Sequence, residues 1–294
     1  MPRGITPRQP SRAGLHDKVS PKPVRAKVTP RRAAPVSRTV TKVAAPAIVA
    51  GKAGLKKAFG RTAGPSLKGY NPLAPQRVGE ILKRLDERYP LATCALHHNS
   101  AWELLVATIL SAQCTDVRVN MVTPILFQKY PTLEHFAALK PRELEPDIRS
   151  TGFFRNKSKS VVGAALKLVS DFGGQIPRTM EELLQLPGVA RKTANVVLGT
   201  WFKIADGVVV DTHVKRISRR LELTKNHDPR KIEQDLMRVV PRDKWIVFAH
   251  QIILHGRALC TARKPNCADC TVENLCHAAD KTWSTVQIHK SAKP

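Results

Sequence analysis

A short segment at residues 186–194 decides how the fold is interpreted, and it reads LPGVARKTA. Its first half joins two expected helices, and its second half opens the later one. The first backbone N–H groups of a helix have no partner inside the helix, so they are free to bind an anion. A tight hairpin of this kind can hold a nucleic-acid phosphate without reading the bases. We expect Gly188, Ala190 and Arg191 to contact phosphate, although similar turns join many ordinary helix pairs.

Helical patterns fill the chain on both sides of this segment. Capping boxes open helices at 100–103 and 179–182. We expect Asp116 to cap a helix that Pro124 kinks or divides. No alternating strand pattern is convincing, so the expected fold class is all-α. The expected helices cover residues 78–85, 100–110, a stretch from 116, 161–172 before Gly173-Gly174, 179–186, 191–203, 228–239 and 243–258.

The charge of the chain is strongly positive and unevenly spread. The 294 residues carry a formal net charge of +26, and the pI is near 10.4. Residues 1–70 hold 16 lysines and arginines against one acidic residue, Asp17. This balance indicates a polyanionic partner, most simply nucleic acid, with a basic solubility tail as the alternative. The lack of an apolar run of roughly 18–20 residues excludes a membrane protein, and only six cysteines, four of them clustered, exclude a disulfide-stapled miniprotein.

The first 75 residues form a basic, proline-rich segment that we expect to be disordered. They contain 11 of the 22 prolines and no tryptophan, so they offer too little apolar surface to offset the entropy of ordering. No apolar stretch follows the first basic residues, which argues against a secretory signal. We expect a cytoplasmic, nucleoid-associated protein, with organelle or nuclear targeting by the tail left open.

Four cysteines near the C-terminus have the spacing C-x6-C-x2-C-x5-C, at Cys260, Cys267, Cys270 and Cys276. Iron–sulfur clusters take four thiolates, whereas zinc prefers paired CxxC knuckles or added histidines. One pair alone has the CxxC form, so the spacing favours a four-iron, four-sulfur (4Fe-4S) cluster over zinc. Cys94 and Cys114 lie apart from this group, and we interpret them as ordinary core residues.

Two further features have both a structural and a functional interpretation. Arg263 and Lys264 lie between the first two cysteines of the group, where a loop pinned by a cluster would present them to phosphates. A solvated charged loop is the alternative. Asp211 precedes the apolar pattern of a helix, so we expect it to be an N-cap. A carboxylate at this position can also face a cleft.

Together these motifs resemble one known family. LPGVARKTA, then VDTH at residues 210–213, then the four-cysteine loop strongly resemble the endonuclease III family in order and spacing. The segments SAQCTD at 111–116 and ILHGR at 253–257 are also similar to that family. The resemblance runs from about residue 76 to 279. It implies a DNA glycosylase that removes oxidised pyrimidines from duplex DNA and has an associated abasic-site lyase activity.

The resemblance also implies roles for single residues. Lys192 matches the nucleophile, which forms a Schiff base with the sugar before β-elimination breaks the strand. Asp211 matches an aspartate that supports the sugar electrostatically, and in proton transfer, as the base departs. Gln113 and Phe153 match the side chains that fill the stack after the base is flipped out. Attack requires a neutral amine, which the start of a helix favours.

The chain departs from the family pattern at two places. The family usually has a Leu-Tyr pair where this chain has Phe153-Phe154, which is either an apolar wedge or a core pair. The family hairpin commonly ends in glycine, whereas this chain has Ala190. A positive φ there would cost on the order of 1 kcal/mol, but we expect Ala190 to begin the next helix without that cost.

The architecture implied by the resemblance is two helical domains with DNA in the cleft between them. Residues 94–205 would form a helical barrel that includes the hairpin. Residues 76–93 would join 206–279 in a cluster domain, and residues 280–294 would be a C-terminal tail. The cluster would fix the shape of the basic loop. The expected partner is duplex DNA with an oxidised pyrimidine or an abasic site, bound by a monomer.

Two other functions are compatible with parts of this pattern. A mismatch-specific adenine glycosylase shares the fold and the cysteine spacing, but it lacks the nucleophilic lysine and carries a large C-terminal domain. Here Lys192 is present and 18 residues follow Cys276. A non-catalytic iron–sulfur DNA-binding protein is the second alternative, and the presence of both Lys192 and Asp211 argues against it.

Overall fold

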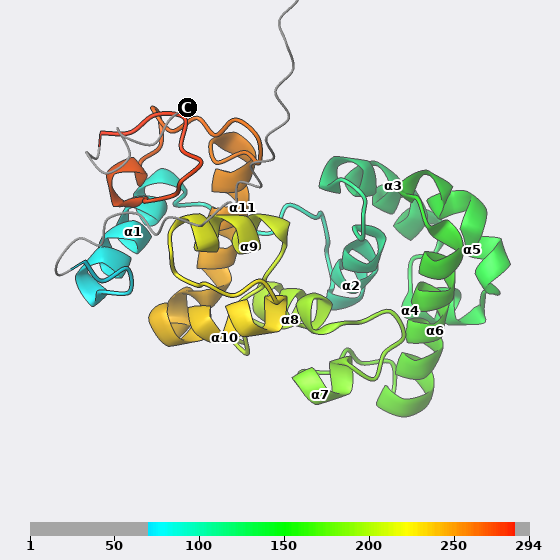
Figure 1. Cartoon of the computed structure of the whole chain (residues 1–294). Helices are drawn as coiled ribbons and strands as arrows, with labels where there is room; N and C mark the ends of the chain where they lie inside the picture. The colour runs from blue at the N-terminus through cyan, green and yellow to red at the C-terminus, as the bar shows by residue number, and fades with distance from the viewer. Residues whose placement is uncertain (1–69, 286–294) are drawn as a thin grey trace, which may run out of the picture. The chain divides into compact units, whose positions relative to one another are not determined.

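The structure, a computed structural model, describes residues 70–285, which consist of helices joined by loops (Figure 1). No strand occurs in that range, so the all-α prediction is confirmed. The helices are α1 (Pro75–Arg88), α2 (Ala101–Leu110), α3 (Asp116–Lys129), α4 (Leu133–Ala138), α5 (Pro141–Ile148), α6 (Phe154–Phe172), α7 (Met180–Leu183), α8 (Arg191–Thr200), α9 (Thr212–Arg220), α10 (Pro229–Val239) and α11 (Trp245–Ala258), with single 3-10 turns η1 (Arg149–Thr151), η2 (Arg242–Lys244) and η3 (Glu273–Leu275).

The predicted N-caps Ser100 and Asp228 are confirmed by their hydrogen bonds, whereas α7 and α8 end before the predicted residues 186 and 203, and α6 begins before residue 161. The Ser100 hydroxyl accepts from the Glu103 N–H at 3.1 Å, and the Asp228 carboxylate accepts from the first turn of α10. The prediction for α3 was wrong in one respect. Thr115 is the N-cap, and Asp116 is the first helical residue. Pro124 lies inside α3 without dividing it, since the helix continues to Lys129.

Helix α2 is the centre of the larger group of packed helices. All but one of its ten residues are buried, and it lies against α3, α6 and α8. Helix α6 packs along α4 and α5, as Figure 1 shows. The sequence of α2, AWELLVATIL, has no polar face to turn to solvent, so other helices must cover it on every side. This group holds the loops at both ends of α2 in place.

A second set of contacts joins helices that are far apart in the sequence. Helix α11 packs against both α1 and α9. The Asp86 carboxylate of α1 accepts from the Gln251 amide at 2.9 Å and from the Lys244 ammonium at 2.9 Å. The N-terminal helix is therefore held against the C-terminal part of the chain.

Side-chain contacts with the helical part of the chain extend beyond residues 76–279, the range over which the sequence resembles the family. The Tyr70 hydroxyl donates to Glu222 at 2.6 Å. Arg220 pairs with Asp280 at 2.5 Å, and Lys281 pairs with the buried Glu273. Residues 1–69 and 286–294 lie outside the described range, and with them most of the predicted tails. Between residues 70 and 285 no helix is long and apolar enough to cross a membrane.

Truncation of the α2 core should destabilise the protein strongly. Leu105 is fully buried, whereas Leu166 on α6 is 51% exposed. Leu105→Ala should lower the free energy of unfolding by about 3 kcal/mol, because it removes apolar contacts and leaves a cavity. Urea unfolding followed by circular dichroism measures the effect. Leu166→Ala is the control, and equal midpoints for the two variants would contradict this account of the core.

Candidate active site and metal centre

Lys192 and Asp211 line the same cleft, although they belong to different helices. The cleft has a volume of about 100 Å³. Lys192 is the only lysine among the described residues that line it. The rest of the lining comes from the segment before α2, the end of α2, the start of α3, α8, the segment before α9 and the middle and end of α11: Thr93, Cys94, Ala95, Leu96, Thr108, Ser111, Asp116, Val196, Val209, His250, Ile253, Leu254 and Arg257.

Lys192 is exposed and sits in the first turn of α8. Ala190 is the N-cap of this helix and provides no side-chain hydrogen bond. The first turn therefore keeps its partial positive charge and its free N–H groups. Both features suit a site that receives an anionic backbone.

Asp211 is a helix N-cap, as one of its two interpretations predicted. Its Oδ1 accepts from the Val214 N–H at 2.8 Å. The other carboxylate oxygen has no hydrogen-bond partner within residues 70–285. The neighbouring His213 is directed elsewhere, because its Nδ1 lies 3.2 Å from the Arg216 guanidinium. Asp211 can therefore cap α9 with one oxygen and present the other to the cleft.

The hairpin before α8 is shaped by Gly188. Its φ is +77°, and a Cβ at this position would lie 2.4 Å from the Ser160 Cβ, so only glycine fits. The Val189 N–H donates to the Leu186 carbonyl at 3.1 Å and closes the turn. Ala190 has a φ of −99°, and it therefore carries none of the strain that a positive φ would impose.

Arg191 is engaged in ion pairs inside the protein. Its Nε donates to the buried Glu233 carboxylate at 2.8 Å, and its Nη2 lies 3.9 Å from Asp206. The hydrogen bond to Glu233 raises the pKa of the guanidinium further. The side chain thus braces α8 against α10, and the contact between Arg191 and phosphate stays a prediction.

Gln113 and Phe153 project from two loop tips. Both have left-handed backbones, with φ values of +53° and +48°. Gln113 is exposed, and Phe153 is 64% exposed, so the core interpretation of Phe153 was wrong. Phe154 packs partly buried against the core instead. One residue of the Phe-Phe pair is structural, and the other is free to contact a partner.

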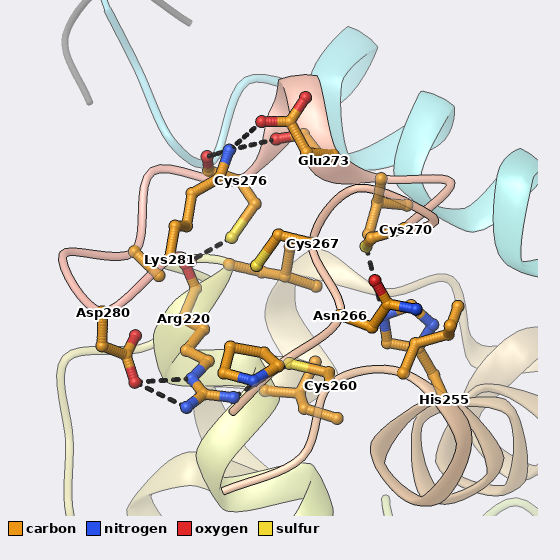
Figure 2. A pocket seen from close by; sticks show the side chains of 16 residues that line it. Arg220, His255, Cys260, Asn266, Cys267, Cys270, Glu273, Cys276, Asp280 and Lys281 are labelled. Atoms are coloured by element: carbon orange, nitrogen blue, oxygen red, sulfur yellow. Dashed lines mark hydrogen bonds and ion pairs between the residues drawn. The ribbon is translucent and has the colours of Figure 1, made fainter. Parts of the chain in front are cut away.

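The four clustered cysteines surround one cavity of about 30 Å³. Figure 2 shows Cys260, Cys267, Cys270 and Cys276 arranged around it. All four are free thiols. No group of three or more metal-ligating side chains between residues 70 and 285 converges closely enough for a single ion.

Burial opposes ionisation of these thiols in the absence of a metal. It raises the pKa of Cys270 to about 12 and of Cys276 to about 11, and the neighbouring thiols add to both shifts. The Arg220 guanidinium donates to the Cys260 Sγ at 3.1 Å, and the His255 Nε2 lies 3.5 Å from the Cys270 Sγ. Four thiolates in this cavity require a metal centre to balance their charge.

The loop between the first two cysteines exposes its basic residues. Arg263 and Lys264 are both exposed. The Thr261 hydroxyl donates to the Lys264 carbonyl at 2.7 Å, and the Asn266 N–H donates to the Leu259 carbonyl at 2.8 Å. These bonds give the loop a defined shape, which suits the predicted phosphate contact.

Sequence reasoning missed an ion pair at the edge of the cleft. The Arg257 guanidinium of α11 donates to the Asp116 carboxylate of α3 at 2.5 Å. The two residues are 141 positions apart, so spacing in the sequence carries no signal of their contact. Cys94 and Cys114 pack partly buried against the core as expected, but Cys94 also lines the cleft.

Comparison with known proteins places these features in one family. The HhH-GPD superfamily of base excision DNA repair proteins matches residues 106–242. The endonuclease III of Synechocystis sp. is 57% identical over 204 residues, which are 69% of this chain and 93% of that protein. The endonuclease III of Bacillus subtilis is 44% identical over 207 residues, which are 70% and 94% of the two chains.

A solved structure agrees with these matches. The structure of a trapped endonuclease III–DNA covalent intermediate in an estranged-adenine complex matches with a TM-score of 0.67 and 40% identity, covering 69% of this chain and 96% of that one. Neither an adenine-specific mismatch glycosylase nor a non-catalytic binder is favoured. The chain therefore belongs to the endonuclease III family of base-excision-repair DNA glycosylases with abasic-site lyase activity.

Proposed function

We propose that this glycosylase removes oxidised pyrimidines from duplex DNA and cleaves the strand through a Schiff base on Lys192. One observation carries the proposal: Lys192 from α8 and Asp211 from α9 line the same cleft. A nucleophile and a carboxylate that share a cleft match the needs of a reaction at a sugar carbon, where positive charge develops as the base leaves.

The proposed reaction removes the base first and then cleaves the strand. The neutral Lys192 amine attacks the sugar C1′, and the base leaves with the bonding electrons. Opening of the sugar ring gives an iminium, which acidifies the C2′ proton. Loss of that proton and of the 3′ phosphate breaks the strand, and water then releases the sugar from Lys192. The free oxygen of Asp211 stabilises the positive sugar and accepts or returns protons.

The proposed grip on DNA uses three kinds of contact. The uncapped start of α8 and the Gly188 hairpin bind a phosphate through backbone N–H groups. Arg263 and Lys264 add salt-sensitive affinity. Gln113 and Phe153 enter the stack of bases. Support comes from their exposure, since each of these four side chains is open to solvent.

Two helical domains are also part of the proposal, with residues 94–205 in one and residues 76–93 and 206–279 in the other. The packing of α11 against α1 and α9 supports this division. The protein would act as a monomer.

The four cysteines would hold a 4Fe-4S cluster. Their side chains surround one cavity, and four cysteine thiolates are the ligand set that iron–sulfur clusters take. When bound, the cluster would supply a rigid, charge-balanced anchor for the basic loop. The residues that would surround it include Arg220 and His255, which contact two of the sulfurs.

Borohydride trapping tests the nucleophile. The wild type incubated with a duplex that contains thymine glycol should form a covalent adduct, and Lys192→Gln should abolish it because no amine attacks C1′. Lys225→Gln, at an exposed lysine outside the cleft, is the control and should still give the adduct. An adduct that survives in Lys192→Gln would assign the nucleophile to another residue.

Substitution of Asp211 separates its charge from its capping role. Asp211→Asn should keep the N-cap but lower the single-turnover rate of base excision by about a hundredfold, because the negative charge is lost. Asp228→Asn, at the N-cap of α10, is the matched control and should leave the rate unchanged. Loss of folded protein in Asp211→Asn alone would mean that Asp211 is mainly structural.

Metal analysis tests the cysteine centre. The purified protein should be brown and hold about four irons per chain. Cys267→Ser should lose most of the iron and the colour, whereas Cys94→Ser, outside the cysteine cavity, should retain both. A colourless wild type with one zinc per chain would overturn the assignment.

A further inference from the structure

Lys157 is a buried lysine that the proposed reaction does not use. It lies on α6 and is 4% exposed. Its ammonium donates to the Leu110 carbonyl at 2.8 Å and to the Thr151 carbonyl at 2.7 Å. Within residues 70–285 no carboxylate lies within ion-pair distance of it, and burial lowers its pKa. An ammonium is costly to bury, so its two hydrogen bonds demand an explanation.

Both acceptors are at the ends of helices. Leu110 is the last residue of α2, and Thr151 is the last residue of η1. Terminal carbonyls have no partner inside their own helix. The hydroxyls of Ser111 and Thr151 already bond to earlier carbonyls of their own segments, at 2.8 Å each. The Lys157 ammonium therefore satisfies two carbonyls from separate segments at once.

Each of these carbonyls stands just before one of the two loop tips. Gln113 follows Leu110 by three residues, and Phe153 follows Thr151 by two. Both tip residues hold a left-handed backbone, a conformation that is unfavourable for residues other than glycine. Such conformations persist where the surroundings over-determine them. The Lys157 ammonium thus links the two segments that precede the loop tips and so fixes the spacing between the tips.

We propose that Lys157 is a positioning residue that holds the Gln113 and Phe153 tips at the separation needed to enter duplex DNA together. The inference rests on the proposed role of these two side chains in the base stack. Lys157 itself touches no substrate, because α6 and the two loops cover it. Its contribution is the fixed geometry of two wedges that would otherwise move independently.

The first test compares Lys157→Met with Lys159→Met. Lys159 is exposed on the same helix and has no described partner, so it is the matched control. Lys157→Met should slow single-turnover excision of thymine glycol from a duplex by about tenfold to a hundredfold, because the wedges are misplaced. Strand cleavage at an abasic site in a single-stranded oligonucleotide should stay within about twofold, since no stack has to be opened there. Equal losses on both substrates would overturn the inference.

A double-mutant cycle with Phe153→Ala gives the decisive readout. If Lys157 acts by placing Phe153, the double variant should be little worse than the slower single variant on the duplex. Additive losses would show that Lys157 affects the fold in general and would overturn the inference. Should Lys157→Met fail to fold, Lys157→Gln takes its place, because it removes the buried charge and keeps N–H donors.

The outcomes also separate this inference from the proposed function. A wild type that excises no thymine glycol, or a Phe153→Ala variant that excises it normally, would contradict the proposed function. Hydrogen exchange on the free protein would still test the positioning. Lys157→Met should speed exchange of the amides at 111–114 and 152–155 by about tenfold relative to Lys159→Met, because ordered loops lose a shared anchor. Unchanged exchange would overturn the inference independently of any activity.

Discussion

The buried carboxylate of Glu233 sets the position of the helix that carries Lys192. It accepts from the Arg191 guanidinium at 2.8 Å and from the Asn195 amide at 2.7 Å, so α8 and α10 share one charge. Gly207 makes room for it, because a Cβ there would lie 2.0 Å from the Glu233 Oε1. Without these donors, the Glu233 carboxylate would be a buried charge with no partner. The loss of stability would be much larger than the net stability that the ion pair contributes. The first turn of α8 is therefore fixed in direction before any DNA arrives.

The N-termini of α8 and α9 both lie at the cleft, but their first-turn N–H groups have different partners. At α9 the Asp211 carboxylate occupies the first-turn N–H of Val214 and leaves negative charge in the cleft. At α8 Ala190 offers no side-chain acceptor, so the first-turn N–H groups are left for an outside anion. A chain with a net charge of +26 attracts DNA at every part of its basic surface. In the proposed reaction, the Asp211 carboxylate would supply local negative charge where the sugar becomes positive.

The features that were predictable from the sequence are those encoded in neighbouring residues. The caps at Ser100 and Asp228, the glycine turn at Gly188 and the cysteine spacing all follow from local chemistry. Helices α4 and α5 were missed because they have only six and eight residues, too few to show a period. Lys157 lies in a polar stretch between the exposed Arg155 and Lys159, so its burial follows from the packing of α6 and could not be predicted from its residue type. The family resemblance supplied the roles of Lys192 and Asp211, and the structure supplied their common cleft.

Helix α9 connects the cysteine cavity with the cleft that Lys192 and Asp211 line. Asp211 caps its N-terminus, and Arg220 is its last residue, about 13 Å away along the axis. Arg220 binds the Cys260 sulfur and the carbonyls of Thr261 and Ala262, so the end of the helix is tied to the loop that presents Arg263 and Lys264. A helix this short does not bend easily between its ends. A shift of the cysteine loop would therefore move the helix as a whole and displace the carboxylate at its other end. A metal centre held by these cysteines would thus help to fix where Asp211 lies in the proposed active site.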